Sequence, residues 1–297
     1  MPSSTKMSSL KNGSGIKKKT QSSLRVKQGF LQLKEKDTSS LNRRVKAMEK
    51  KTEDVMWLER TVAEIVTENH LTTEIFEKYG IDFCCGGNKT VKQACEERGI
   101  NIEEIEKELK QAYRKRDEFR DSNQYDKWEL DFLADYITNQ FHSYTKDTIY
   151  RLREIIDKVA NVHGERHPET LRIRQIWHEL SGELIKHMQK EELLLFPYIK
   201  QLVRAKREGT KPKPPVFGSI NNPIKVMEAE HKHTGDCLGE ISTLSNGFNP
   251  PEDACPTYRT MYEYLKEFDR ITKMHIHLEN NILFPRAMRL EEELGNT

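Results

Sequence analysis

The chain contains two blocks in which a histidine, a glutamate and a phenylalanine–proline pair recur at the same spacing. The Glu follows the His by four residues and the Phe follows it by nine: His187, Glu191 and Phe196, then His275, Glu279 and Phe284. On a helix, positions i and i+4 lie on one face about 5–6 Å apart, so an imidazole and a carboxylate can point at one metal ion. A single pair is ordinarily a surface ion pair, but its repetition within two apolar helical stretches predicts metal ligation by both blocks.

Two further histidines extend this pattern. His142, His187, His231 and His275 follow one another at intervals of 45, 44 and 44 residues, each in helical context. This interval fits one long helix plus a connection, so each helix of an up-down four-helix bundle would offer one His at a similar depth. Alone, His142 or His231 would more often be an ordinary core or surface histidine. As members of the series they are predicted ligands.

The fold class predicted for the chain is all-α. A four-helix bundle is expected over residues 125–292, with breaks at 163–168, 211–215 and 249–251, where Gly and Pro cluster. Pro197 and Pro285 close the two repeated blocks, and we expect them to disrupt or end their helices because proline has no backbone N–H.

A small helical domain is expected over residues 55–118, before the bundle. Thr61 opens a capping-box pattern, Gly80 is placed to stop a helix, and Thr90 begins a short helix that carries Cys95. The apolar positions between these signals have helical spacing. The sequence therefore predicts several short helices around a loop at residues 81–88.

Adjacent cysteines in that loop, Cys84 and Cys85, precede the paired glycines Gly86 and Gly87. Glycines allow tight or left-handed turns, and the N-terminus of a following helix can lower the pKa of a nearby thiol and so favour the thiolate. These features favour redox or metal-transfer chemistry by Cys84 and Cys85. The alternative is that one cysteine packs as a small hydrophobe and the other has no particular role.

Composition limits the classes of partner. The formal net charge of the 297 residues is only +2, so no nucleic-acid partner is implied for the chain as a whole. No apolar run of eighteen residues and no secretory signal is present, so we expect no membrane span. The five cysteines are an odd number without zinc-type spacing, which favours a reducing compartment over a disulfide scaffold. A cytoplasmic location is expected.

Residues 1–52 differ from the rest of the chain. Up to Lys34 they contain eight Lys or Arg and no Asp or Glu, together with many Ser and Thr. Such a segment cannot bury enough apolar surface to offset its chain entropy, so a disordered basic tail is expected. A transit peptide to an organelle matrix is the alternative, although the shortage of Arg counts against it. A nucleic-acid-binding tail is a weaker option.

These motifs resemble those of a known family, the iron–sulfur cluster repair di-iron proteins, whose bundle is hemerythrin-like. The resemblance covers residues 55–290 and rests on five segments: the loop 82–87 with Cys95, and the segments 162–168, 187–197, 230–231 and 275–287. The cysteine–glycine motif joined to this bundle is specific to the family. The bundle motifs alone would indicate only a hemerythrin-like protein.

The resemblance implies two non-haem iron ions with an oxo or hydroxo bridge. It implies these ligands: His142, His187, His231 and His275, with Glu191 and Glu279 as bridging carboxylates. Imidazole and carboxylate groups suit such ions. How the four histidines divide between the two irons stays open.

The implied function is repair of iron–sulfur clusters damaged by nitric oxide or peroxide, by donation of iron to damaged iron–sulfur proteins. Reduction of nitric oxide at the same centre, an enzymatic activity, is the first alternative, and oxygen binding or sensing as in hemerythrin is the second. Oxygen carriers typically have an Asp five residues after a ligand His. Glu192 and Asn280 occupy those positions here, which counts against oxygen carriage. A monomer and a homodimer are both open.

Other polar residues near the ligands are weaker candidates. His233 and His277 lie two residues from predicted ligands, about 200° around the helix, and are expected to face elsewhere. Glu183 and Glu230 could support the ligand histidines or lie on a solvated face.

Overall fold

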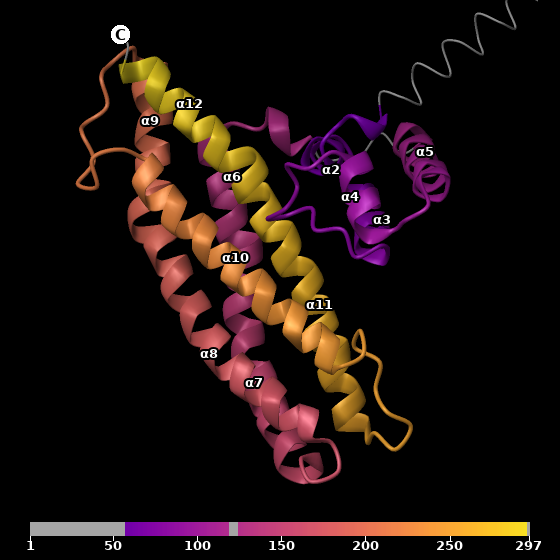
Figure 1. The fold of residues 1–297 in the computed structure, drawn as a ribbon. Helices are drawn as coiled ribbons and strands as arrows, with labels where there is room; N and C mark the ends of the chain where they lie inside the picture. Colours follow the sequence, from indigo (N-terminus) through magenta and orange to yellow (C-terminus); the bar gives the residue numbers. More distant parts are fainter. Residues whose placement is uncertain (1–56, 119–123, 296–297) are drawn as a thin grey trace, which may run out of the picture. The chain divides into compact units, whose positions relative to one another are not determined.

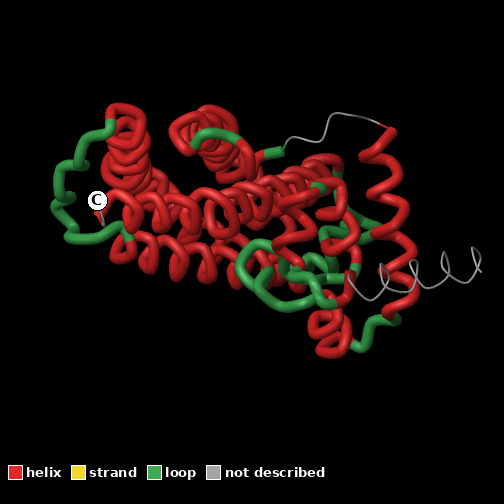
Figure 2. The backbone as a smooth tube through the Cα atoms, turned by 90° about the horizontal axis from the view of Figure 1, so that it is seen from above, coloured by secondary structure: helices red, strands yellow, loops and turns green. Residues whose placement is uncertain are grey.

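The computed structural model describes residues 57–118 and 124–295. Every named element in these ranges is helical, and the only β-type pairing in them is an isolated bridge between Thr61 and Thr90 (Figure 2). The prediction of an all-α fold is confirmed. The expected basic tail, residues 1–52, lies outside the described residues. Within the described ranges, no helix combines the length and the apolar character that a membrane span requires.

Short helices and turns make up the N-terminal part of the described chain (Figure 1). They are α2 (Val62–Glu68), η1 (His70–Thr72), α3 (Thr73–Lys78), α4 (Val91–Arg98) and α5 (Ile102–Glu118). Thr61 and Thr90 both form the complete capping box. The Thr side chain accepts the backbone N–H of the third helical residue, whose side chain accepts the backbone N–H of the Thr. Both predicted helix starts are confirmed.

Glycine allows the loop between α3 and α4 to close. Gly80 has a φ of +65°, which only glycine adopts without strain, and it follows Tyr79, the C-cap residue of α3. A Cβ on Gly87 would lie 2.6 Å from the Phe83 carbonyl oxygen and 2.9 Å from Ala63 Cβ. Gly87 therefore lets the cysteine loop pack directly against the start of α2.

Four long helical rods form the bundle (Figure 1). The first is α6 (Leu130–Tyr136), η3 (Ile137–His142) and α7 (Ser143–His163), preceded by the turn η2 (Tyr125–Lys127). The second is α8 (Pro168–Lys190), η4 (Glu191–Leu195) and α9 (Phe196–Glu208). The third is α10 (Asn221–Leu244), and the fourth is α11 (Pro256–Leu278), η5 (Glu279–Leu283) and α12 (Phe284–Gly295). Of the three breaks expected between rods, each falls in a connection between two of them.

Pro197 and Pro285 do not end their helices. The disruption is confined to the π-helical turns η4 and η5, and each proline then lies in the first turn of the next α-helical segment. Proline is tolerated there because its missing N–H is not needed for an intrahelical bond. The expectation of a disrupted helix is met, whereas an ended helix would have been wrong.

Buried apolar side chains fill the bundle at both ends. One cluster joins α6, α9, α12 and the start of α10, and the other joins α7, α8, α11 and the end of α10. Along every rod, the segment between the two clusters carries predicted metal ligands, so the polar layer is enclosed by apolar packing on both sides.

Candidate metal centre

All six predicted ligands meet in one buried layer of the bundle. None of them is more than 4% exposed: His142, His187, Glu191, His231, His275 and Glu279. The first rod contributes one ligand, the second two, the third one and the fourth two. In each His–Glu pair, the glutamate is the first residue of a π-turn and the histidine lies in the α-helix before it. π-turns within helices are frequent at functional sites.

The six side chains form two overlapping groups. His142 and His275 make one group with Glu191 and Glu279, and the ligand atoms of the four lie within 4.8 Å of one another. His187 and His231 make the second group with the same two glutamates, within the same limit. Each carboxylate thus belongs to both groups, an arrangement suited to bridging two ions.

Distances across the layer support this division. The Nε2 atoms of His142 and His275 are 3.2 Å apart, and those of His187 and His231 are 2.9 Å apart. Glu191 Oε2 lies 3.4 Å from His142 Nε2 and 3.3 Å from His187 Nε2. Glu279 Oε1 lies 2.9 Å from His275 Nε2, and its Oε2 lies 3.2 Å from His231 Nε2. Each carboxylate therefore lies close to one histidine of each pair.

The carboxylates and imidazoles of the layer shift one another's pKa values. Burial alone would lower the pKa values of His142 and His187, but Glu191 and Glu279 raise them to about 9 and about 10. Burial would likewise raise the pKa of Glu279, but the surrounding imidazoles, His275 foremost, hold it well below its usual range. Metal ions that bind here would displace the protons of His142 and His187.

Unpartnered oxygens show that the layer fits a cation. Neither carboxylate oxygen of Glu191 has a hydrogen-bond partner among the described residues, and Glu279 Oε2 also has none, although all three are buried. Glu191 Oε2 and Glu279 Oε2 do lie 3.2–3.4 Å from imidazole nitrogens, but a buried carboxylate without hydrogen bonds is costly unless it is paired or coordinates a metal ion. The donor set of imidazoles and carboxylates suits iron.

Groups behind the ligands orient three of the histidines. His142 Nδ1 donates to Glu192 Oε1, His187 Nδ1 donates to Glu230 Oε2, and His231 Nδ1 donates to Asn280 Oδ1, each at 2.8 Å. Such bonds fix the tautomer and direct the other ring nitrogen, Nε2, toward the metal position.

Sequence reasoning missed the role of Glu192 and Asn280, which it considered only as departures from oxygen carriers. Both lie five residues after the histidine of a repeated block, and each holds a histidine from another rod. The common position of Glu192 and Asn280 in the two repeated blocks could therefore have indicated that both have the same role.

Two family models match the chain. A domain of unknown function (DUF542, ScdA_N) matches residues 58–113, and the hemerythrin HHE cation binding domain matches residues 133–287. A probable iron-sulfur cluster repair protein of Haemophilus influenzae is 34% identical over 219 residues, which are 73% of this chain and 91% of the relative. The chain belongs to the iron–sulfur cluster repair protein family.

Other members of the family are similar to the chain at the same level. The repair protein YtfE of Pectobacterium atrosepticum is 34% identical over 240 residues, 78% of this chain and 98% of the relative. The repair protein ScdA of Staphylococcus haemolyticus is 31% identical over 228 residues, 76% of this chain and 96% of the relative. The resemblance expected from the sequence motifs is confirmed.

The weaker candidates separate into distinct roles. Glu230 supports His187, as described above, whereas Glu183 pairs with His233 on the surface, with both side chains more than half exposed. His277 is buried but faces away from the metal layer: its Nδ1 accepts from Asn281, and its Nε2 lies 3.4 Å from Thr67 Oγ1 in α2.

The cysteine loop lies against the fourth rod of the bundle. Cys84 is buried and Cys85 is half-buried. The Asn280 side-chain amide donates to the Cys84 carbonyl at 3.3 Å, and that of Asn281 donates to the Phe83 carbonyl at 3.2 Å. The cysteine motif is therefore attached to the π-turn that begins with the predicted ligand Glu279.

The thiol of Cys84 differs from expectation. Its hydrogen bond to Cys85 and its burial raise its pKa well above the usual range, so a free thiolate is disfavoured. Helix α4, whose N-terminus was expected to lower a thiol pKa, begins only at Val91. Cys95 is fully buried among apolar side chains of the small helices.

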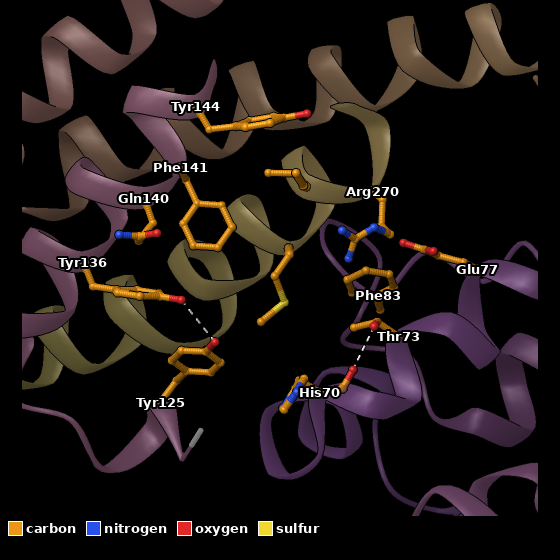
Figure 3. A pocket seen from close by; sticks show the side chains of 12 residues that line it. His70, Thr73, Glu77, Phe83, Tyr125, Tyr136, Gln140, Phe141, Tyr144 and Arg270 are labelled. Atoms are coloured by element: carbon orange, nitrogen blue, oxygen red, sulfur yellow. Dashed lines mark hydrogen bonds between the residues drawn. The ribbon is translucent and has the colours of Figure 1, made fainter. Parts of the chain in front are cut away.

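A hollow of about 410 Å³ lies beside the metal layer (Figure 3). The rings of Tyr136, Phe141 and Tyr144 lie along one side of it, and His70 lies on the other. Phe141 stacks on the ligand His275, with ring centroids 5.6 Å apart and planes at 23°. One aromatic ring therefore separates the hollow from a predicted ligand.

Proposed function

We propose that this protein repairs iron–sulfur clusters damaged by nitrosative or oxidative stress, and that it does so by donating iron from a di-iron centre. The relatives' names indicate cluster repair, and the buried layer supplies a donor set for the iron. One observation carries the proposal: Glu191 and Glu279 belong to both four-residue groups, as bridging carboxylates would.

In this proposal His142 and His275 hold one iron, His187 and His231 hold the other, and the two glutamates bridge them. When bound, the irons would supply exchangeable ions for repair and electrons for reaction with nitric oxide or peroxide. Six protein ligands for two ions leave coordination positions for a bridge and for exchange. Glu192, Glu230 and Asn280 keep the imidazoles oriented while ions enter or leave, and the histidines take up protons as iron departs.

Cys84 and Cys85 act in this proposal in delivery or electron transfer rather than as ligands of the bundle centre. Their loop contacts the π-turn after Glu279 through Asn280 and Asn281, which supports a role close to the centre. The partners are damaged iron–sulfur proteins. We place the protein in the cytoplasm, a reducing compartment that suits five cysteines without disulfide bonds.

Iron transfer tests the function directly. Full-length protein loaded with ⁵⁷Fe is mixed with a [4Fe–4S] dehydratase that peroxide has converted to its [3Fe–4S] form, in the presence of an iron chelator. We expect ⁵⁷Fe in the repaired cluster by Mössbauer spectroscopy, faster than from a matched amount of chelated iron. Cys84→Ser with Cys85→Ser should slow transfer without changing the iron content. Repair without ⁵⁷Fe in the client would overturn donation.

The di-iron assignment has its own test. Glu191→Ala combined with Glu279→Ala removes both proposed bridges and two negative charges, so bound iron should fall well below two per chain by elemental analysis. Glu183→Ala is the matched control, because Glu183 is an exposed glutamate on the same helix as His187. Two irons retained in the double variant, with an unchanged spectrum, would refute the assignment.

Reduction of nitric oxide is the second candidate, and the aromatic hollow favours it (Figure 3). Aromatic rings form one side of the hollow and suit a small uncharged molecule, and Phe141 stacks on His275; Glu77 and Arg270 also line the hollow. The reaction consumes two nitric oxide molecules, two electrons and two protons and yields nitrous oxide and water. Nitrous oxide formed by the reduced protein at a rate that accounts for client protection, without iron transfer, would favour this candidate.

A further inference from the structure

Three potential metal ligands lie together in the cysteine loop, apart from the six residues of the bundle. The Sγ atoms of Cys84 and Cys85 are 3.8 Å apart, and Cys84 Sγ lies 3.2 Å from Asp82 Oδ1. One ligand atom from each of the three residues falls within the same 4.8 Å limit that unites each group in the bundle. Two thiols and a carboxylate at this separation can contact one ion.

The loop holds these groups in place before any ion binds. Asp82 Oδ1 accepts the backbone N–H groups of Cys84 at 3.0 Å and of Cys85 at 2.9 Å, which fixes the turn. Gly86 leaves room for the carboxylate, because a Cβ there would lie 3.1 Å from Asp82 Oδ2. Asn280 and Asn281 anchor the Cys84 carbonyl from the bundle side. The three ligand residues are thus preorganised by both parts of the described chain.

The group is also reachable. Asp82 is exposed and Cys85 half-buried, and both line a hollow of about 710 Å³ that also contacts Lys232 and Lys273. Lys232 pairs with Asp236 at 2.9 Å, and Lys273 pairs with Asp269 at 2.6 Å. These carboxylates offset the positive charge that an entering cation would meet. An ion could therefore enter from solvent, or from a protein docked over the hollow.

We propose that Asp82, Cys84 and Cys85 form a second metal site, which takes one thiophilic divalent cation such as Fe(II) or Zn(II). Thiolates select such ions over Mg(II) or Ca(II), and three protein ligands leave a position open for a ligand from outside. Binding forms two metal–sulfur bonds and one metal–oxygen bond and releases the two thiol protons to solvent. No electron is transferred.

The site deepens the proposed function, on which its role as an exit position for donated iron rests. The Cys84 carbonyl is bonded to Asn280, whose side-chain oxygen in turn accepts from the bundle ligand His231. The thiol site and the bundle centre are therefore joined through a single side chain. A labile site with an open position next to a buried store is suited to handing an ion to a client.

Cobalt(II) tests the site in the full-length protein. The bundle is first loaded with iron, and all thiols are kept reduced with a phosphine. We expect one additional equivalent of Co(II) to bind and to give a thiolate-to-cobalt charge-transfer band in the near ultraviolet. Cys84→Ser and Cys85→Ser should each abolish or strongly reduce this band. Asp82→Asn, which can still accept the backbone N–H groups but carries no charge, should weaken Co(II) binding. Cys237→Ser, on α10, is the control and should keep the band.

Absence of the band, or its persistence when both Cys84 and Cys85 are replaced by Ser, would overturn the proposal. Iron content of the bundle is measured in the same samples and should stay unchanged in every variant. A cobalt band without ⁵⁷Fe transfer to the damaged client would uphold this site and refute donation. Transfer without the band would refute the site and leave donation standing.

Discussion

Glu230 is not among the six predicted ligands, yet it holds one of them, His187, in place. Its carboxylate accepts from His187 Nδ1 and also pairs with Lys190. The His187 hydrogen bond, followed by that of Lys190, lowers the pKa of Glu230 to about 2, so it stays charged at any pH at which the protein would bind iron. A charged acceptor behind an imidazole raises the basicity of the nitrogen that faces the metal.

Replacement of Glu230 by Gln should weaken iron binding about tenfold, since the amide can still accept from His187 but carries no charge. Competition with a chromophoric chelator at neutral pH measures the effect. Glu240→Gln is the control on the same helix, because Glu240 is exposed and pairs with Arg172 on the surface. An unchanged iron affinity in Glu230→Gln would mean that Glu230 only neutralises Lys190.

At the scale of the element, the π-turns set the register between the metal layer and the packing beyond it. The turn η4, which begins with Glu191, separates His187 on α8 from the apolar face of α9, which includes Phe196, Ile199 and Leu202. One residue rotates a helix by about 100°, so a single insertion or deletion decides which face of α9 meets the core.

Deletion of Leu193 should therefore unfold or strongly destabilise the bundle, although this side chain is 74% exposed. Rotation of α9 would expose several apolar side chains, each contributing about 1.5–3 kcal/mol by burial. We expect a fall in Tm of about 10 °C or more by calorimetry. Leu193→Ala keeps the register and should shift Tm by only about 1–2 °C. Equal effects of the two changes would show that the π-turn does not set this register.

At the scale of the whole molecule, the small helices and the bundle are joined by polar contacts around the fourth rod and by Ile276 of α11, which is buried in the apolar cluster of the small helices. Asn281 donates to the carbonyls of Phe83 and Cys84 and to His277 Nδ1, which lies 3.0 Å away. The ring of His277 meets that of Phe83 edge-on, with centroids 5.9 Å apart. The cysteine loop depends on these contacts for its position.

Asn281→Ala should loosen the loop while leaving the bundle intact. The variant leaves the Phe83 carbonyl and one imidazole nitrogen without the Asn281 donor, at a cost of about 1–3 kcal/mol, whereas the Cys84 carbonyl keeps its bond from Asn280. Faster hydrogen exchange of the amides in residues 81–88, followed by mass spectrometry, is the expected result, with unchanged iron content. Asn249→Ala, an exposed asparagine in the α10–α11 connection, should have no effect. Loss of iron in Asn281→Ala would contradict the separation of the two sites.

A chain that begins at residue 53 should bind iron and transfer it as the full-length protein does. All six predicted ligands lie within residues 57–295, as do the two apolar clusters of the bundle and the apolar cluster of the small helices. Elemental analysis and the ⁵⁷Fe assay measure the outcome. Reduced iron content in this truncated protein would assign residues 1–52 a part in the centre, contrary to the tail predicted from their composition.

The sequence by itself determined the helices and the identity of the six predicted ligands. Spacing of four residues, the near-constant interval between histidines and the capping residues Thr61 and Thr90 are local properties of the chain, and local geometry converts them into faces and helix starts. At Pro197 the sequence left open whether the helix is disrupted or ends, because a break and a π-turn share the same local signal.

Only the tertiary structure decided which residues act together. The pairing of His142 with His275, the support of His142 by Glu192 and of His231 by Asn280, and the contact of the cysteine loop with the bundle all join residues 49 or more positions apart. No periodicity encodes such pairs, because they depend on how rods pack and on the rotation that each π-turn adds. Packing therefore converted a set of ligand candidates into two groups that share two carboxylates.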